Sequence, residues 1–323
     1  MTPSLAWMRD PQGLALLEAA KLHPEDTSYR LVLSDWLEEQ GESEAAEALR
    51  NSLKHESRWI HLPDSVAERW QRIKLFRDGW PVCQVAVSDF LSWPDSPVPV
   101  CPWLTILHLR YDRIPFDSIK KLSNSPHLAN LSTLEIWRID TTHHGDELVR
   151  HLSENKQLNK LSHLDLWNNQ LSYHAANSLA KSPQMSQLVY LLLCCNSIGD
   201  TGVDSLTRSH HLTRLRWLYL GKNNITAQGA LALANSPQSA SLLSLDLWQN
   251  SIGDEGTRAL AYSRHLSQLT FLGLDANGIT NKGARYLVDS PYLSQLKELS
   301  VSANPIDQNI IELLKERYAS VRF

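Results

Sequence analysis

Leucines recur along most of this chain at a fixed interval, and this spacing limits the possible folds more than any other feature. Eight segments follow the pattern L-x-x-L-x-L-x-x-N-x-L, and successive segments begin 27 residues apart except once, where the interval is 30. The first leucines of the segments are Leu104, Leu131, Leu161, Leu188, Leu215, Leu242, Leu269 and Leu296. A constant period of this length is typical of a repeat array, in which each unit packs against its neighbours.

The L-x-L core of each unit predicts a short strand, because alternate side chains of a strand point to opposite faces. Leu164 and Leu166 are expected to point inward, while Asp165 and Trp167 point outward. Strands of successive units should then stack in parallel. After each strand, a buried asparagine is expected to satisfy backbone groups that the turn leaves without partners. These asparagines are Asn169, Asn196, Asn223, Asn250, Asn277 and Asn304.

The second half of each unit predicts a helix, with core-facing leucines at helical spacing. Asp200, Thr226, Asp254 and Thr280 are the expected N-caps. Two early units depart from the pattern. Asp112 replaces the asparagine in the first unit, and Ile139 replaces it in the second, which is also lengthened around residues 141–146. An irregular turn is therefore expected there.

Motifs such as "LDLWQNSIGDEGTRALA" resemble the ribonuclease-inhibitor-like class of leucine-rich repeats, and the resemblance covers residues 101–306. It implies an α/β horseshoe solenoid with parallel strands on the concave side and helices on the convex side. It also implies protein–protein recognition, commonly through the concave face, and no catalysis in this part of the chain.

The stretch "RLVLSDWLEEQG", Arg30 to Gly41, resembles the bacterial repeat-companion domain. The resemblance implies a bacterial origin and a small all-α domain in front of the repeats, which we place at residues 1–56. Asp35 is expected to cap a helix or to pair with Arg30. A small core is expected to form from Leu14, Leu17, Leu31, Leu33, Trp36 and Leu37.

The segments on either side of the repeats are predicted to cover the ends of the array, since an open sheet edge is a liability. Residues 57–100 form a junction whose alternating valines, Val82, Val85 and Val87, predict a strand over the N-terminal edge. Residues 307–323 predict a charged amphipathic helix followed by a short strand, as a C-terminal cap.

Composition and charge exclude several classes of function. The net charge is −4 and no long run of Lys or Arg occurs, so nucleic acid is not an expected partner. No stretch approaches 18 apolar residues, and the first ten residues do not read as a signal peptide, so no membrane partner is expected. The four cysteines, Cys83, Cys101, Cys194 and Cys195, lack metal-ligand spacing and are expected to be reduced in a cytoplasmic protein.

No catalytic, phosphate-binding or metal-binding motif occurs in the sequence. The pairs His143–His144 and His210–His211 are adjacent in the chain and are read as solvated loop histidines rather than as metal ligands. No histidine recurs in register beside Cys194, so a nucleophilic cysteine is not favoured. The sequence therefore predicts no enzyme, no cofactor and no metal.

The outward positions of the strands carry the candidate site. Four of the eleven tryptophans fall there, together with tyrosines, a phenylalanine and the carboxylates Glu135, Asp165, Asp246 and Asp275. Because adjacent strands lie side by side, Tyr190 is expected beside Trp217. Exposed aromatic patches often mark interaction sites, and Trp and Tyr often dominate binding energy. The expected partner is a protein of basic or apolar character. The predicted partner-binding residues are Trp137, Asp165, Trp167, Tyr190, Leu192, Trp217, Tyr219, Asp246, Trp248 and Phe271.

Three alternatives remain open from the sequence. The aromatic residues can stack on one another only to stabilise the sheet. Trp137, Trp167 and Trp248 can serve as stacking platforms for a glycan or another small ligand, with Asp165 and Asp246 as hydrogen-bond acceptors. The repeats can also act as a structural spacer for the N-terminal domain.

Overall fold

The computed structural model describes most of the second half of the chain and selected parts of the first. The described residues are 10, 12–13, 15–16, 27–41, 43, 46–47, 50, 59–61, 73–77, 80–85, 90–91, 106–110, 116–129, 131–138 and 144–323. The chain divides into two compact units. The first contains residues 1–110 and 125–135, and the second contains residues 111–124 and 136–323.

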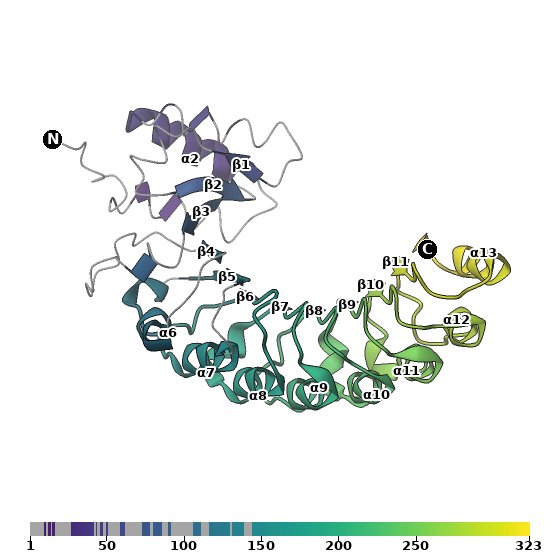
Figure 1. The fold of residues 1–323 in the computed structure, drawn as a ribbon. Coiled ribbons are helices and arrows are strands. Elements are labelled where there is room, and N and C mark those ends of the chain that lie inside the picture. The colour runs from purple at the N-terminus through teal and green to yellow at the C-terminus, as the bar shows by residue number, and fades with distance from the viewer. Residues whose placement is uncertain are drawn as a thin grey trace. The chain divides into compact units, whose positions relative to one another are not determined.

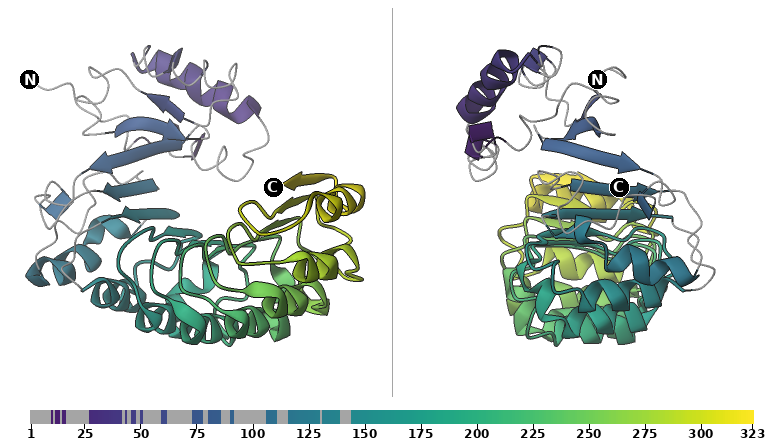
Figure 2. Two further views of the ribbon diagram at one scale, coloured as in Figure 1. Left: turned by 45° about the vertical axis from the view of Figure 1, so that its right-hand side comes forward. Right: turned by 90° about the vertical axis from the view of Figure 1, so that its left-hand side faces the viewer.

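The second unit is an α/β solenoid in which each short strand is followed by a helix. Its strands are parallel and pair in chain order from β6 to β12. Figures 1 and 2 show β6 to β11 on the inner side of an arc and helices α7 to α12 on its outer side. The strands are β6 His163–Asp165, β7 Tyr190–Leu192, β8 Trp217–Tyr219, β9 Ser244–Asp246, β10 Phe271–Gly273, β11 Glu298–Ser300 and β12 Ser320–Arg322. The helices are α6 Phe116–Ser123, α7 Gly145–Glu154, α8 Tyr173–Lys181, α9 Gly199–Thr207, α10 Ala227–Asn235, α11 Gly253–Ala261, α12 Asn281–Val288 and α13 Gln308–Arg317.

The predicted asparagines form a continuous ladder beneath the turns. Asn223 is fully buried, and its Nδ2 donates to the carbonyls of Leu193 at 2.8 Å and Leu220 at 3.1 Å. Its Oδ1 accepts from the Ile198 amide at 3.1 Å. The contacts reach back into the preceding repeat, so each asparagine joins two successive repeats. This prediction is confirmed, and it explains why an amide side chain, which both donates and accepts, stands at this position.

Two of the four predicted N-caps are confirmed and two are wrong. The hydroxyls of Thr226 and Thr280 cap α10 and α12. Asp200, in contrast, lies inside the first turn of α9, and its carboxylate accepts from the Thr226 amide at 2.8 Å and the Gly229 amide at 2.9 Å. Asp254 bonds Thr280 and Gly283 in the same way. Each of these aspartates therefore stabilises the start of the following helix.

The same arrangement recurs at every second helix. Asp146 of α7 accepts from the amide of Ser172, the N-cap of α8, at 2.8 Å. The aspartate-bearing helices α7, α9 and α11 thus alternate with the capped helices α8, α10 and α12. At the end of the array α12 also holds its successor, because Asn281 accepts from the amide of Asp307, the N-cap of α13, at 2.8 Å. Gly229 and Gly283 fit this contact because a Cβ at either would lie 2.6 Å or less from the aspartate Oδ1. The array is built from pairs of repeats, with a period of 54 residues between equivalent aspartates.

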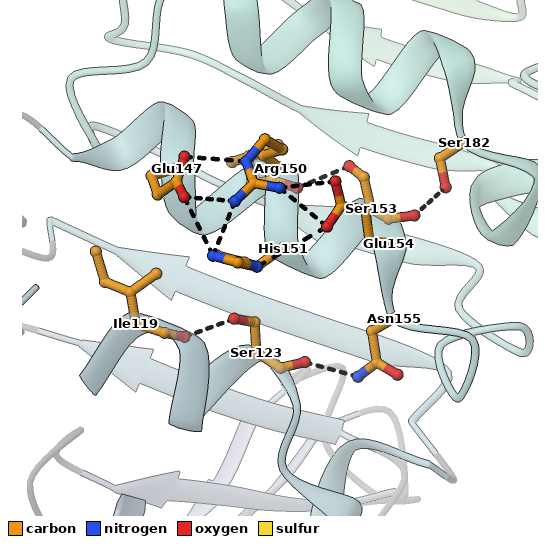
Figure 3. Close-up of polar contacts among 10 residues, drawn as sticks. Ile119, Ser123, Glu147, Arg150, His151, Ser153, Glu154, Asn155 and Ser182 are labelled. Carbon is orange, nitrogen blue, oxygen red and sulfur yellow. Dashed lines mark hydrogen bonds and ion pairs between the residues drawn. The ribbon is translucent and has the colours of Figure 1, made fainter. Parts of the chain in front are cut away.

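A second ladder joins the repeats where the helices end. The hydroxyl of Ser182 donates to the Ser153 carbonyl at 2.5 Å, as Figure 3 shows. Ser236 donates to the carbonyl of Thr207 at 2.7 Å, and Ser263 and Ser290 make equivalent bonds. One repeat earlier, Asn155 takes the place of the serine, and its side-chain Nδ2 donates to the Ser123 carbonyl at 2.7 Å (Figure 3). Carbonyls left free at the ends of helices are thus satisfied by the next repeat.

The first unit contains α2 Thr27–Glu39, where the expected small core is confirmed in part. Leu33, Trp36 and Leu37 are buried, and the Trp36 ring lies against Gly13. Leu31, however, is 45 % exposed, so its placement in this core was wrong. Leu14 and Leu17 lie outside the described residues.

Asp35 has a charged partner elsewhere in the first unit. It accepts from Arg50 at 2.7 Å, and Arg50 also contacts Glu38. The side chain of Arg30, with which Asp35 was expected to pair, lies outside the described residues, so that pairing stays a prediction. The two carboxylates raise the pKa of the Arg50 guanidinium above its usual range, chiefly through the hydrogen bond that Arg50 donates to Asp35. Asp35 thus serves a local structural contact within the first unit.

Both ends of the array carry the expected strands. In the first unit, β1 Trp59–His61, β2 Ile73–Arg77 and β3 Trp80–Val85 pair antiparallel in order, and β3 then pairs in parallel with β4 Ile106–Arg110. Val82 and Val85 lie on β3, while Val87 falls outside the described residues. At the far end, α13 is followed by β12, which pairs with β11. The strand β5 Thr133–Trp137 crosses the division between the units. The predicted irregular turn at Ile139, like Asp112, lies outside the described residues.

Candidate functional site

The concave face of β7 to β10 presents two columns of side chains in strict register. The first column runs Tyr190, Trp217, Ser244 and Phe271, and the second runs Leu192, Tyr219, Asp246 and Gly273. The aromatic members are half-buried. Each strand contributes one residue to each column, because parallel pairing without a bulge keeps equivalent positions side by side. We call the aromatic and carboxylate residues of these two columns the concave strip.

The rings of the concave strip contact one another across the strands. Tyr190 and Tyr219 meet edge to face with their centroids 5.2 Å apart, and His163 stacks on Tyr190 at 5.7 Å with an interplanar angle of 21°. The sequence led us to expect Tyr190 beside Trp217. Their backbones do pair, but the ring contact of Tyr190 is diagonal, to Tyr219. The hydroxyl of Ser244 donates to that of Tyr219 at 3.2 Å, which fixes the outer end of the ring.

Trp137 and Trp167 form a separate pair. Their rings lie 6.2 Å apart at 71°, an edge-to-face arrangement that aromatic pairs prefer. The amide of Trp167 donates to Asp165 at 3.0 Å. The structure therefore brings these three predicted site residues together, and strands β7, β8 and β9 lie between β6 and Phe271 on β10.

The indole ring of Trp248 packs over Gly221 of the preceding repeat. A Cβ on Gly221 would lie 1.9 Å from Trp248 Nε1, so the indole occupies the space above this glycine. The indole also lies beside the buried thiol of Cys194. One ring face of Trp248 is thereby covered. Sequence reasoning missed this contact, although the small residue at 221 beside a tryptophan one repeat later was the available signal.

The carboxylates of the face are held by backbone amides. Asp246 accepts from the Trp248 amide at 3.1 Å, just as Asp165 accepts from that of Trp167. Burial raises the pKa of Asp246 to about 6, and the negative charge of Asp275 adds to the effect. Asp275 itself accepts from the Ser300 hydroxyl and the Ser302 amide, both at 2.7 Å. A carboxylate that is desolvated and lies beside another carboxylate favours a cationic neighbour.

Several residues that the sequence placed outward have other surroundings. His108 and Glu135, on β4 and β5, are 2 % and 3 % exposed and lie 3.5 Å apart between Nδ1 and Oε2. Glu135 was expected along the accessible strip, and its burial corrects that expectation. Cys194 is also buried, and burial raises the pKa of its thiol to about 12, with a smaller effect from Asp246. A thiol with that pKa is protonated at neutral pH and is a poor nucleophile.

Neither a candidate metal cluster nor a membrane-spanning helix is present among the described residues. Among them, no group of three or more His, Cys, Asp or Glu side chains is placed to hold a metal. His210 and His211 line a groove between α8 and α9 on the helix side, while His143 lies outside the described residues. In the part of the chain that the structure describes, no helix combines the length and the apolar character needed to cross a membrane.

Comparison with known proteins supports the fold. The family described as Leucine Rich repeat matches residues 208–234 and 238–261, which cover β8, β9, α11 and all but the last residue of α10. No curated protein matches the chain. Together with the parallel strands and outer helices, the match supports a leucine-rich-repeat protein, a class whose repeats generally mediate contacts between proteins. The ribonuclease-inhibitor-like type and the companion domain stay predictions.

Proposed function

We propose that this chain is a non-catalytic scaffold that binds a protein partner on the concave strip. The observation that carries the proposal is the combination of half-buried rings and carboxylates on one face. At the concave positions of β6 to β10 there is no Lys or Arg to balance Asp165, Asp246 and Asp275. Tyr190, Trp217, Tyr219 and Phe271 lie among these carboxylates. A basic or apolar partner surface complements such a face.

The strip has the properties expected of a binding centre. Its rings are fixed by the Tyr190–Tyr219 contact and by the Ser244 hydroxyl, so little side-chain freedom remains to be lost on binding. A cation placed near Asp246 would also relieve the repulsion between that group and Asp275. Stacking within the sheet and recognition by it are therefore compatible roles for the same residues.

The test is a triple substitution, Tyr190→Ala, Trp217→Ala and Tyr219→Ala. The wild-type chain, tagged and used as bait in the native cell, is expected to capture a partner that mass spectrometry identifies, and the triple variant is expected to lose it. Tyr173→Ala with Tyr292→Ala, two exposed tyrosines off the strip, is the matched control and should capture normally. Circular dichroism melts establish that each variant is folded. Unchanged capture by the triple variant would rule out the strip as the site.

The glycan alternative depends on open indole faces. Trp248 lies over Gly221, and Trp137 and Trp167 pack edge to face, which favours a protein partner over a stacked sugar. Titration of tryptophan fluorescence with a glycan panel separates the two, because a protein-binding strip is expected to give a flat response. The spacer alternative predicts that residues 1–56 alone retain the captured partner.

A further inference from the structure

Helix α10 is unusual among the described α-helices because it carries no charged side chain. No Asp, Glu, Lys or Arg occurs between Lys222 and Asp246. Its neighbours do carry charge, with Asp204 on α9 and Glu255 and Arg258 on α11. Yet α10 lies on the outer side of the arc, and Leu231 is 42 % exposed there. An uncharged helix face in water is a candidate for coverage by another molecule.

A groove runs between α10 and α11 at this place. Its volume is about 620 Å³. Its apolar lining residues are Ala227, Leu231 and Ala234 from one helix and Ala259 and Tyr262 from the other, and polar and charged side chains make up the rest. Tyr262 is 45 % exposed and is held edge to face against Tyr286, with centroids 6.1 Å apart. Leu231 and Tyr262 are therefore two exposed apolar side chains in a groove of mixed character, and the ring of Tyr262 is fixed by its neighbour.

The uncompensated charge around the groove is positive. Arg258, Arg264 and His265 line it, and its single acidic lining residue, Glu255, is shared between Lys282 at 3.0 Å and Arg258 at 3.7 Å. Arg264 makes no ion pair with any residue that the structure describes. An occupant that places carboxylates near Arg258 and Arg264 would complement this charge.

The same groove recurs one pair of repeats earlier, with different chemistry. Between α8 and α9, a groove of about 400 Å³ is lined by residues 54 positions before those of the first. There, Asn177 and Arg208 stand where Leu231 and Tyr262 stand in the later groove. Because the same backbone arrangement accepts polar residues at these positions, the fold does not require apolar side chains there between α10 and α11.

We propose that the α10–α11 groove is a second docking site, independent of the concave strip, for an acidic amphipathic helix of a partner protein. The apolar stripe of that helix covers Leu231 and Tyr262, and its acidic residues meet Arg258 and Arg264. The groove follows α10 from Ala227 to Asn235, which spans ~12 Å, the length of about two helical turns. Docking of this kind uses apolar anchors at helical spacing.

The repeat array supplies its own test variant. Leu231→Asn combined with Tyr262→Arg gives the α10–α11 groove the residues that the scaffold already accepts in the α8–α9 groove. The probes are two labelled synthetic helical peptides with the same leucine stripe, one flanked by glutamates and the other by lysines. Fluorescence anisotropy is expected to show that the glutamate peptide binds the full chain, and that the double variant weakens it by about tenfold or more. Failure of the glutamate peptide to bind, or equal binding by the variant, would overturn the proposal.

A second variant keeps the test valid if the first does not fold. Arg264→Glu changes one exposed side chain and should reverse the preference, so that the lysine peptide binds more tightly than the glutamate peptide. Equal affinity of both peptides for the wild-type chain would overturn the assigned charge. The other possible occupant of the groove is a second copy of this chain, and light scattering of the full chain tests for it. A dimer that is present in the wild type and lost in the double variant would assign the groove to that second copy and overturn the proposal.

Discussion

The two faces of strands β7 to β10 differ in how much they vary along the array. On the face that packs against the helices, leucine recurs in every strand. Leu191, Leu218, Leu245 and Leu272 are all 3 % exposed or less. On the concave face, the residues beside them are tyrosine, tryptophan, serine and phenylalanine. Packing between successive repeats requires the same residue type at equivalent positions, because each leucine contacts the equivalent leucine of the next repeat. The concave face is free of that demand, and its variation is available for recognition.

Removal of one asparagine from the ladder should give the largest loss of stability. Asn223→Ala leaves the Leu193 and Leu220 carbonyls and the Ile198 amide without this partner in a buried turn. We expect a loss of about 3–5 kcal/mol in the free energy of unfolding, since each unsatisfied buried group costs about 1–3 kcal/mol. Urea denaturation followed by circular dichroism measures it, with the exposed Thr213→Ala as control. A loss no greater than that of the control would contradict the role of the ladder.

Adjacent residues on opposite faces of β8 provide the most direct comparison. Leu218→Ala should cost about 2–4 kcal/mol, because it opens a cavity in the core. Trp217→Ala should cost about 1 kcal/mol or less, the value of a lost cross-strand contact. Thermal melts of the two variants measure the difference. Equal losses would show that the concave face contributes to stability as much as the core does.

Asp246 offers a further comparison of the two faces, because its contribution to the free energy of unfolding should depend on pH, whereas that of the buried leucines should not. A carboxyl whose pKa rises to about 6 on folding favours the folded state at low pH, and this contribution is lost as the pH rises through 6. Asp246→Asn keeps the acceptor for the Trp248 amide and removes the charge. Relative to wild type, the variant should gain ~1–2 kcal/mol in unfolding free energy between pH 4 and pH 7, after allowance for solvent screening. Urea midpoints at the two pH values test this, and parallel shifts of both proteins would refute it.

The smallest expected effect concerns the aspartates that link successive helices. Asp200→Ala removes bonds to the Thr226 and Gly229 amides and should cost about 1–2 kcal/mol, as for loss of a helix cap. Asp204→Ala, on the same helix, removes an exposed ion pair with Arg208 at 2.9 Å and should cost about 0.5 kcal/mol or less. Differential scanning calorimetry resolves the pair. If Asp204→Ala proved the more destabilising, the cross-repeat cap would have no importance.

The period of the sequence predicted the strands, the outer helices and the asparagine ladder, because each depends on one position within a repeat. The caps at Asp200 and Asp254 were mispredicted because capping rules consider only residues near in sequence. The observed donors lie 26 and 29 residues later, in the next repeat. Leu31 was placed in a core because it is apolar, although burial depends on which neighbouring elements pack against that face.

The candidate site was predictable as a set of outward positions but not as a set of contacts. The register placed Tyr190 opposite Trp217, whereas the ring contact depends on rotamers and goes to Tyr219. The cover of Trp248 over Gly221 and Cys194 depends on a missing side chain in the adjacent repeat. The groove beside α10 escaped notice because it is formed by the convex helices, on which the sequence pattern indicated no aromatic cluster.

The alternation of cap-donating and capped helices sets the step by which such an array can grow or shrink. Duplication of a single donor repeat would leave one aspartate without its cap partner, and duplication of a single capped repeat would leave one helix start without its carboxylate. Duplication or excision of a pair preserves every junction, since Asp146, Asp200 and Asp254 are each followed by a Ser or Thr cap in the next repeat. Designed or evolved variants of this chain should therefore differ in length by multiples of 54 residues.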